Sequence, residues 1–173
     1  DNEELAISQA NEIINEYPKI FKKKWLNIMR KKLGLIKIEK NDESLINNLL
    51  NIMSKNNLDF TETFRNLSNQ YILNQENNRE INIWKNQWNE RIKKEETDFE
   101  KISYQMNKIN PFYIPRNHLI EKVINEAIEN DNFQPLDKIL DLIYEPYSEK
   151  VDDHFYKATP EPEERVFQTF CGT

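Results

Sequence analysis

The stretch "NDESLINNLLNIMSK", residues 41–55, decides the fold class of this chain. Asn41 or Asp42 is expected to cap a helix here. The apolar residues that follow recur at steps of three and four, which places them on one helix face: Leu45, Ile46, Leu49, Leu50 and Met53. A helix with one apolar face buries that face against a neighbour, so the pattern predicts a domain of packed helices.

The same spacing continues upstream, from about Glu3 to Lys32. One face of this segment carries Ile13, Ile14, Tyr17, Ile20, Phe21, Trp25, Ile28 and Met29. Pro18 lies inside the pattern and either kinks the helix or begins a second one, because proline lacks the N–H that an interior turn uses. Gly34 is expected to end the helix in the left-handed conformation, after basic residues that suit a helix C-terminus.

Downstream, "LDFTETFRNL" (residues 58–67) predicts a helix that Asp59 caps, with Glu62 three residues later as in a capping box. We expect Phe60, Phe64 and Leu67 to pack inward. A polar loop is predicted over residues 69–79, and a long helix or helix pair over residues 80–108. The charged "KKEETD" (residues 93–98) is the expected break in that pair. Its apolar markers are Ile81, Trp84, Trp88, Ile92, Phe99, Ile102, Met106 and Ile109.

The segment "NPFYIPRNH", residues 110–118, stops this helix because Pro111 and Pro115 do not allow it to continue. Arg116 and Asn117 stand just before the next helix. They either satisfy backbone groups at that helix start or bind a carboxylate or phosphate. We favour the structural role, because helix starts require caps. Asn110, Pro111, Pro115, Arg116 and Asn117 are therefore predicted to form a structural motif.

Two further helices follow, separated by a turn at Asp131 or Asn132. The first carries Leu119, Val123, Ala127 and Ile128, and the second, from about Pro135, carries Leu136, Ile139, Leu140 and Ile143. After Tyr144 the pattern ends in prolines and acidic residues, which indicates an irregular tail. No segment alternates as a strand would. The predicted architecture is all-α, with a helical region over residues 1–143 and an irregular tail over residues 144–173.

Composition excludes several classes of site. The two glycines, Gly34 and Gly172, cannot build a P-loop, a glycine-rich kinase loop or a dinucleotide-binding turn. The net charge of −6 argues against nucleic-acid binding, and no apolar run approaches the length of a membrane span. The single cysteine excludes an internal disulfide framework. The first residue is Asp1 and not Met, so we expect a fragment of a longer protein.

The remaining candidate residues mostly favour structural roles. His118 and His154 have no metal-ligand spacing, so we expect ordinary histidines at the surface or at a helix start. The tryptophans Trp25, Trp84 and Trp88 are either a binding surface or core residues, and their helical spacing favours the core.

Cys171 differs from these residues, because it lies three residues from the end of the sequence. Access to a thiol at a chain end favours redox chemistry. Phe167 and Phe170 are spaced to anchor the tail in an apolar groove. Glu163, Glu164 and the terminal carboxylate are negative, so nothing local stabilises the thiolate of Cys171.

Five segments in a fixed order carry a resemblance. They are "MRKKLGL" (residues 29–35), "DFTETFRNLS" (59–68), "NPFYIPRNHLIEKVI" (110–124), "DKILDLIYEPY" (137–147) and "PEERVFQTFCGT" (162–173). Together they resemble the C-terminal third of the selenoprotein-O family, also called YdiU. The resemblance spans nearly the whole chain. Its most specific parts are the Asn-Pro-x-x-Ile-Pro-Arg-Asn-His block and the terminal Cys-Gly-Thr.

The resemblance implies a protein-kinase-like fold that works as a protein adenylyltransferase. Such an enzyme binds ATP with Mg²⁺ or Mn²⁺ and transfers AMP to Ser, Thr or Tyr hydroxyls of protein substrates. Its catalytic, nucleotide-binding and metal-binding residues belong to a part N-terminal of Asp1. We therefore expect no catalytic, cofactor or metal residue in this chain, and no activity from the chain alone. The resemblance also implies that Cys171 is redox-regulatory and pairs with a cysteine of the kinase-like core.

Two hypotheses of different classes follow. In the first, the chain buttresses the kinase-like domain of its own enzyme, with protein substrates as further partners and neither nucleic acid nor membrane. The expected compartment is the bacterial cytoplasm, with an organelle as the alternative. In the second, the chain is a free-standing helical interaction module without activity. A reading frame that continues upstream of Asp1 into a kinase-like domain favours the first hypothesis, and a start codon beside Asp1 favours the second.

Overall fold

The computed structural model describes residues 2–69, 78–150 and 155–165, and within these ranges it is helical without a β-strand. The expected all-α class is confirmed for this part of the chain. The α-helices are α1 (Asn2–Lys32), α2 (Asp42–Lys55), α3 (Phe60–Ser68), α4 (Arg79–Lys93), α5 (Phe99–Asn107), α6 (Asn117–Asn130) and α7 (Gln134–Tyr144). In this part of the chain, no helix has both the length and the apolar character needed to cross a membrane.

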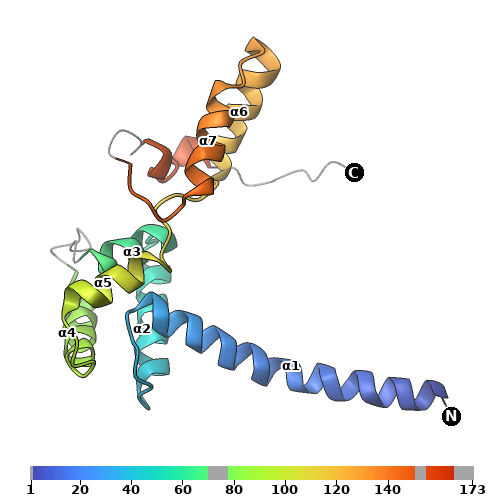
Figure 1. Cartoon of the computed structure of the whole chain (residues 1–173), viewed down its shortest axis with the longest axis vertical. Coiled ribbons are helices and arrows are strands. Elements are labelled where there is room, and N and C mark those ends of the chain that lie inside the picture. The colour runs from blue at the N-terminus through green and yellow to red at the C-terminus, as the bar shows by residue number, and fades with distance from the viewer. Residues whose placement is uncertain (1, 70–77, 151–154, 166–173) are drawn as a thin grey trace.

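The main core lies among α2, α3, α4, α5 and the C-terminal end of α1 (Figure 1). Helix α4 packs on α2, and α5 packs on α3. Within this main core, the side chains of Trp84 and Trp88 are stacked with ring centroids 6.1 Å apart. The indole Nε1 of Trp84 donates to the carbonyl of Leu45 at 2.8 Å, and that of Trp88 to the carbonyl of Leu33 at 2.9 Å. Each buried indole thus has the partner that its N–H requires.

A second, smaller layer is the hairpin of α6 and α7, which projects from the opposite end of the molecule to α1 (Figure 1). Its buried side chains are Leu119, Val123, Ile139, Phe112, Tyr113 and Leu142. Asp131 makes the turn between the helices with φ of 48°. Beyond Tyr144, a short 3-10 helix, η2 (Pro162–Glu164), returns to α6 through an ion pair of Glu164 with Lys122 at 2.5 Å.

The predicted helix ends are confirmed where residue chemistry sets them. Helix α2 runs over the predicted residues 42–55, although the side chain of its N-cap residue, Asn41, makes no capping hydrogen bond. Gly34 has φ of 72°, and the N–H of Leu35 reaches back to the carbonyl of Arg30 at 2.9 Å, which closes the end of α1. The charged segment 93–98 separates α4 from α5 as expected, with Glu96 at φ of 53°.

Pro18 lies within one continuous helix, α1, which excludes the alternative in which it begins a second helix. Some predictions about packing were wrong. Phe60 is 45% exposed, because it stands in the first turn of α3 with its ring against Phe64. Ile128 and Leu140, predicted on the inner faces of α6 and α7, are 77% and 55% exposed, since a hairpin of two helices covers only one side of each.

The largest difference concerns α1. Of the eight side chains predicted to share one face of this helix, Met29 is buried. The other seven are only partly buried or exposed: Ile13, Ile14, Tyr17, Ile20, Phe21, Trp25 and Ile28. Helix α1 contacts α2 and α5 at its C-terminal end and otherwise extends away from the body (Figure 1). The periodicity was therefore helical as predicted, but the residues that the structure describes leave most of this face exposed.

Candidate functional site

Asn110 is the centre of the predicted structural motif, and its side chain is fully buried. Its amide Nδ2 donates to the carbonyl of Lys32 at 2.9 Å and to Oγ of Ser68 at 2.9 Å. The Nζ of Lys32 donates to its Oδ1 at 3.3 Å. Arg65 donates from Nη1 to the carbonyls of Asn107 and Asn110 at 3.2 and 3.0 Å. These bonds join the ends of α1, α3 and α5 at one point.

Arg116 forms the second part of this corner. Its Nη1 and Nη2 donate to Oδ2 and Oδ1 of Asp59 at 2.9 and 3.1 Å, and its side chain is 9% exposed. Arg116 stands at the N-cap position of α6 without capping it through its side chain. It therefore binds a carboxylate of this chain, and the expected contact with backbone groups at the helix start was wrong. Asn117 is the exposed first residue of α6.

Asp59 serves two helices at once. Its Oδ1 also accepts from the backbone N–H of Glu62 at 2.7 Å, which confirms the predicted cap of α3. Burial raises the pKa of the Asp59 carboxyl, but the hydrogen bonds from Arg116 and from the backbone outweigh it, so the pKa lies below its ordinary value. The carboxylate is therefore charged and fully engaged in structure.

A buried ionic cluster lies beside α2 and was missed by the sequence analysis. Asp42, predicted only as a possible cap, is fully buried and accepts from Nε of both Arg30 and Arg91 at 2.8 Å each. Its Oδ2 also accepts from the backbone N–H of Glu39 at 2.9 Å. Arg91 further donates from Nη1 to Glu95 at 2.6 Å. The only sequence signal for the cluster was the four-residue spacing of Arg91, on α4, and Glu95, just beyond its end.

Electrostatics in this cluster favour the charged forms. Burial alone raises the pKa of Asp42, but hydrogen bonds from Arg91, the Glu39 N–H and Arg30 lower it further than burial raises it. The pKa of Arg91 is raised, because its two carboxylate partners outweigh its own burial. Both arginines are neutralised by side chains of this chain. The cluster therefore stabilises the contact of α1, α2 and α4.

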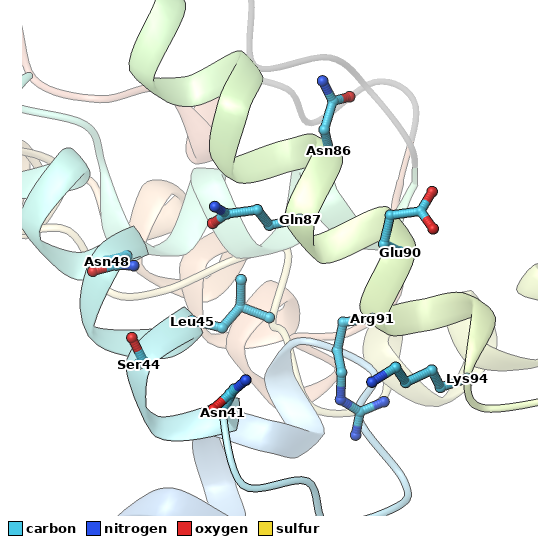
Figure 2. Close-up of a pocket in the computed structure, with 9 residues that line it drawn as sticks. All are labelled: Asn41, Ser44, Leu45, Asn48, Asn86, Gln87, Glu90, Arg91 and Lys94. Carbon is cyan, nitrogen blue, oxygen red and sulfur yellow. The ribbon is translucent and has the colours of Figure 1, made fainter.

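A hollow of about 690 Å³ opens between α2 and α4 next to this cluster (Figure 2). Figure 2 shows polar side chains along both walls. One wall has Ser44 and Asn48 on α2 with the N-cap residue Asn41, and the other has Asn86, Gln87 and Glu90 on α4 with the C-cap residue Lys94. Amides and hydroxyls there can hydrogen-bond a polar ligand. The guanidinium of Arg91 is already bound to Asp42 and Glu95. The lining contains no cysteine or histidine, so it offers neither the thiol nor the imidazole of a nucleophile–base pair.

The other candidate residues are placed as follows. His118 is the second residue of α6 and is 6% exposed, so the helix-start prediction was right and the surface prediction was wrong. Burial is the main cause that lowers its pKa. Trp84 and Trp88 are core residues, whereas Trp25 is partly buried. His154, Phe167, Phe170 and Cys171 lie outside the described residues. Within the described residues, no group of three or more acidic, histidine or cysteine side chains is arranged to hold a metal.

Comparison with known proteins gives a consistent result. The family model described as "Protein adenylyltransferase SelO" matches residues 4–144. A protein nucleotidyltransferase YdiU of Nitrosococcus oceani is 37% identical over 175 residues, which cover 100% of this chain and 36% of that protein. The YdiU proteins of Bradyrhizobium diazoefficiens and Bacillus cereus are 35% and 36% identical, again over 100% of this chain. The chain thus spans a little over a third of the length of these relatives.

Proposed function

The chain belongs to the SelO family of protein adenylyltransferases, and from this membership we propose that it works as part of an enzyme that transfers AMP from ATP to proteins. The observation that carries the proposal is the family match over residues 4–144, together with 35–37% identity to nucleotidyltransferases over the whole of this chain. The acceptor groups proposed are Ser, Thr and Tyr hydroxyls. The proposed compartment is the bacterial cytoplasm, in keeping with the bacterial relatives.

Within such an enzyme we assign this chain a supporting role. ATP and a divalent metal are the expected cofactors of the whole enzyme, and we assign their site to a part outside this chain. The buried carboxylates Asp42 and Asp59 are engaged by arginines and backbone N–H groups, which leaves neither of them free to hold Mg²⁺. Instead, the buried polar groups at Asn110 and Arg116 hold helices together. This arrangement suits a buttress for a kinase-like catalytic part.

The test compares the whole protein with residues 1–173. Each is incubated with ATP labelled in its AMP part and either Mg²⁺ or Mn²⁺, with a generic protein acceptor present. We expect covalent AMP on the acceptor or on the enzyme itself for the whole protein, and none for residues 1–173. Labelling by residues 1–173 alone would contradict the supporting role. A whole protein that transfers no AMP under either metal would contradict the enzymatic assignment.

A redox role for Cys171 remains part of the proposal, although this residue lies outside the described structure. The resemblance to the family is its only support. Glu164, seven residues before Cys171, is paired with Lys122, which ties the tail to α6 at that point. From there a chain of seven residues reaches about 25 Å when extended.

A further inference from the structure

Helix α1 presents an apolar stripe that the described residues leave uncovered. The stripe follows steps of three, four and seven along the helix and consists of Ile13, Ile14, Tyr17, Ile20, Phe21 and Ile28, each between 51% and 70% exposed. Tyr17 and Phe21 stack on each other within it, with ring centroids 6.0 Å apart. A run of large apolar side chains on one face marks an interaction surface, whereas singly scattered ones do not.

The stripe does not face the body of this chain. Met29, buried in the main core, and Leu26, partly buried against it, lie on the other side of the helix. On that side Lys22 also reaches α2, through an ion pair with Glu43 at 2.8 Å. Because successive residues turn by about 100°, the stripe points away from these contacts.

Two lysines interrupt the stripe in register. Lys24 follows Ile20 by four residues, and Lys31 follows Ile28 by three, so both lie on the apolar face. Both are exposed, and neither has an ion-pair partner among the described residues. A surface that covers Ile28 also desolvates the cations beside it, which is costly without carboxylates opposite them.

From this pattern we propose that the α1 stripe is the docking surface for the rest of the enzyme. The partner's face is apolar where it meets residues 13–21 and carries carboxylates where it meets Lys24 and Lys31. The inference rests on the proposed function for the identity of the partner. It is supported by the relatives, of which this chain matches only 36–37% of the length, so each has a large further part that can cover the stripe. The family match includes most of α1, from residue 4 onward.

Hydrogen exchange of the α1 backbone tests the docking. In residues 1–173 alone, the segment 5–28 should exchange quickly, because an isolated helix end opens easily. In the whole protein the same amides should exchange at least about tenfold more slowly. The double variant Tyr17→Glu/Phe21→Glu should remove this protection in the whole protein. It should leave the thermal midpoint of residues 1–173 unchanged, since both side chains are exposed there. Ile128→Glu, at a 77% exposed position on α6, is the matched control. It should change neither the protection of α1 in the whole protein nor the thermal midpoint of residues 1–173.

Charge reversal tests the carboxylates. Lys24→Glu/Lys31→Glu should speed exchange of α1 in the whole protein by about tenfold, while Lys24→Arg/Lys31→Arg should retain the protection. Lys40→Glu, at an exposed lysine outside α1, should have no effect. If Lys24→Glu/Lys31→Glu leaves the hydrogen exchange of α1 unchanged, the proposal that the partner face carries carboxylates opposite these lysines is wrong.

Three results would overturn the docking itself. One is equally fast exchange of residues 5–28 in the whole protein and in the isolated chain. Another is a concentration-dependent dimer of residues 1–173 that the Tyr17→Glu/Phe21→Glu variant abolishes, which would assign the stripe to a second copy. The third is binding of residues 1–173 to vesicles containing anionic lipid, lost in the same variant. None of these readouts depends on AMP transfer, so a protected α1 in a protein without that activity would contradict the proposed function and leave the docking intact.

Discussion

Arg116 and Asp59, 57 residues apart in the sequence, form a two-pronged ion pair that joins the start of α6 to the start of α3. This pair connects the α6–α7 hairpin to the main core. Asp59 is at the same time the N-cap of α3 through its bond to Glu62. One carboxylate therefore fixes both a helix start and the position of the second layer.

Removal of the Arg116 side chain should destabilise the chain. Arg116→Ala leaves the partly buried Asp59 carboxylate without its cation, and we expect a loss of about 1–3 kcal/mol in the free energy of unfolding. Urea unfolding of residues 1–173 measures it. Arg79→Ala, at an exposed arginine in the first turn of α4, should change stability by less than about 0.5 kcal/mol. An unchanged urea midpoint for Arg116→Ala, with activity lost in the whole protein, would instead indicate a binding role.

Stability should fall in acid. The pKa values of Asp42 and Asp59 are lowered by folding, because hydrogen bonds to arginine and backbone donors outweigh burial. Such groups stabilise the fold above their unfolded pKa, near 3.8, and this contribution is lost as the pH falls through the lower folded pKa. We expect the free energy of unfolding to decline from about pH 4 downward, as measured by urea titrations at several pH values.

Asp42→Asn separates the contribution of the buried cluster. The variant should be less stable at pH 7, because Arg30 and Arg91 lose the charge that neutralises them. Its stability should also depend less steeply on pH below about 4. Asp141→Asn, at an exposed aspartate on α7, is the control and should follow the unmodified chain. An acid profile of Asp42→Asn that parallels the unmodified chain would contradict the assignment.

Gly34 should not tolerate a side chain. Its φ of 72° is unfavourable for any L-residue with a Cβ, and a Cβ there would stand 2.7 Å from Sδ of Met106 and also clash with Ile102. Gly34→Ala should therefore cost at least about 2 kcal/mol in thermal or urea unfolding, since strain and overpacking add. Asn57→Gly, at a left-handed residue with φ of 52°, should be neutral or slightly stabilising. A neutral Gly34→Ala would show that the α1–α5 contact is loosely packed.

Cys171 should change its accessibility with redox state in the whole protein. Under mild oxidant we expect its thiol to become protected from alkylation, and the reductant dithiothreitol to restore it, because a disulfide to another part of the enzyme consumes it. Mass spectrometry of alkylated peptides measures this, and Cys171→Ala should remove the change in free-thiol count. In residues 1–173 the only disulfide available is between two copies, because Cys171 is the single cysteine. A freely alkylatable Cys171 in oxidised whole protein would refute the redox role.

Local chemistry made several features predictable. The bounds of α2, the left-handed end at Gly34 and the cap at Asp59 each depend on residues a few positions apart. The burial of Trp84 and Trp88 followed from their four-residue spacing on one helix face. The family was likewise evident from short segments in order, and the family match over residues 4–144 agrees with it.

The ion pairs could not be predicted, because the sequence does not specify which distant residues meet. Asp42 and Arg91 are 49 residues apart, and Arg116 and Asp59 are 57 apart. Asp42 looked like a helix cap, and Arg116 like a residue that satisfies a helix start. Only the tertiary structure, which brings α1 and α4 to α2 and the start of α6 to the start of α3, turned both into partners of buried charges.

The sequence by itself determined that α1 is a helix with one apolar face, because a spacing of three and four residues has that meaning wherever the helix lies. Only the tertiary structure decided that this face lies outside the core that the described residues form. The spacing of apolar residues indicates that one face of the helix favours burial, but it does not indicate which surface covers that face. Met29 turns inward and Ile28, one residue earlier, turns outward, so one helix serves the core of this chain with one side and offers the other side to a partner.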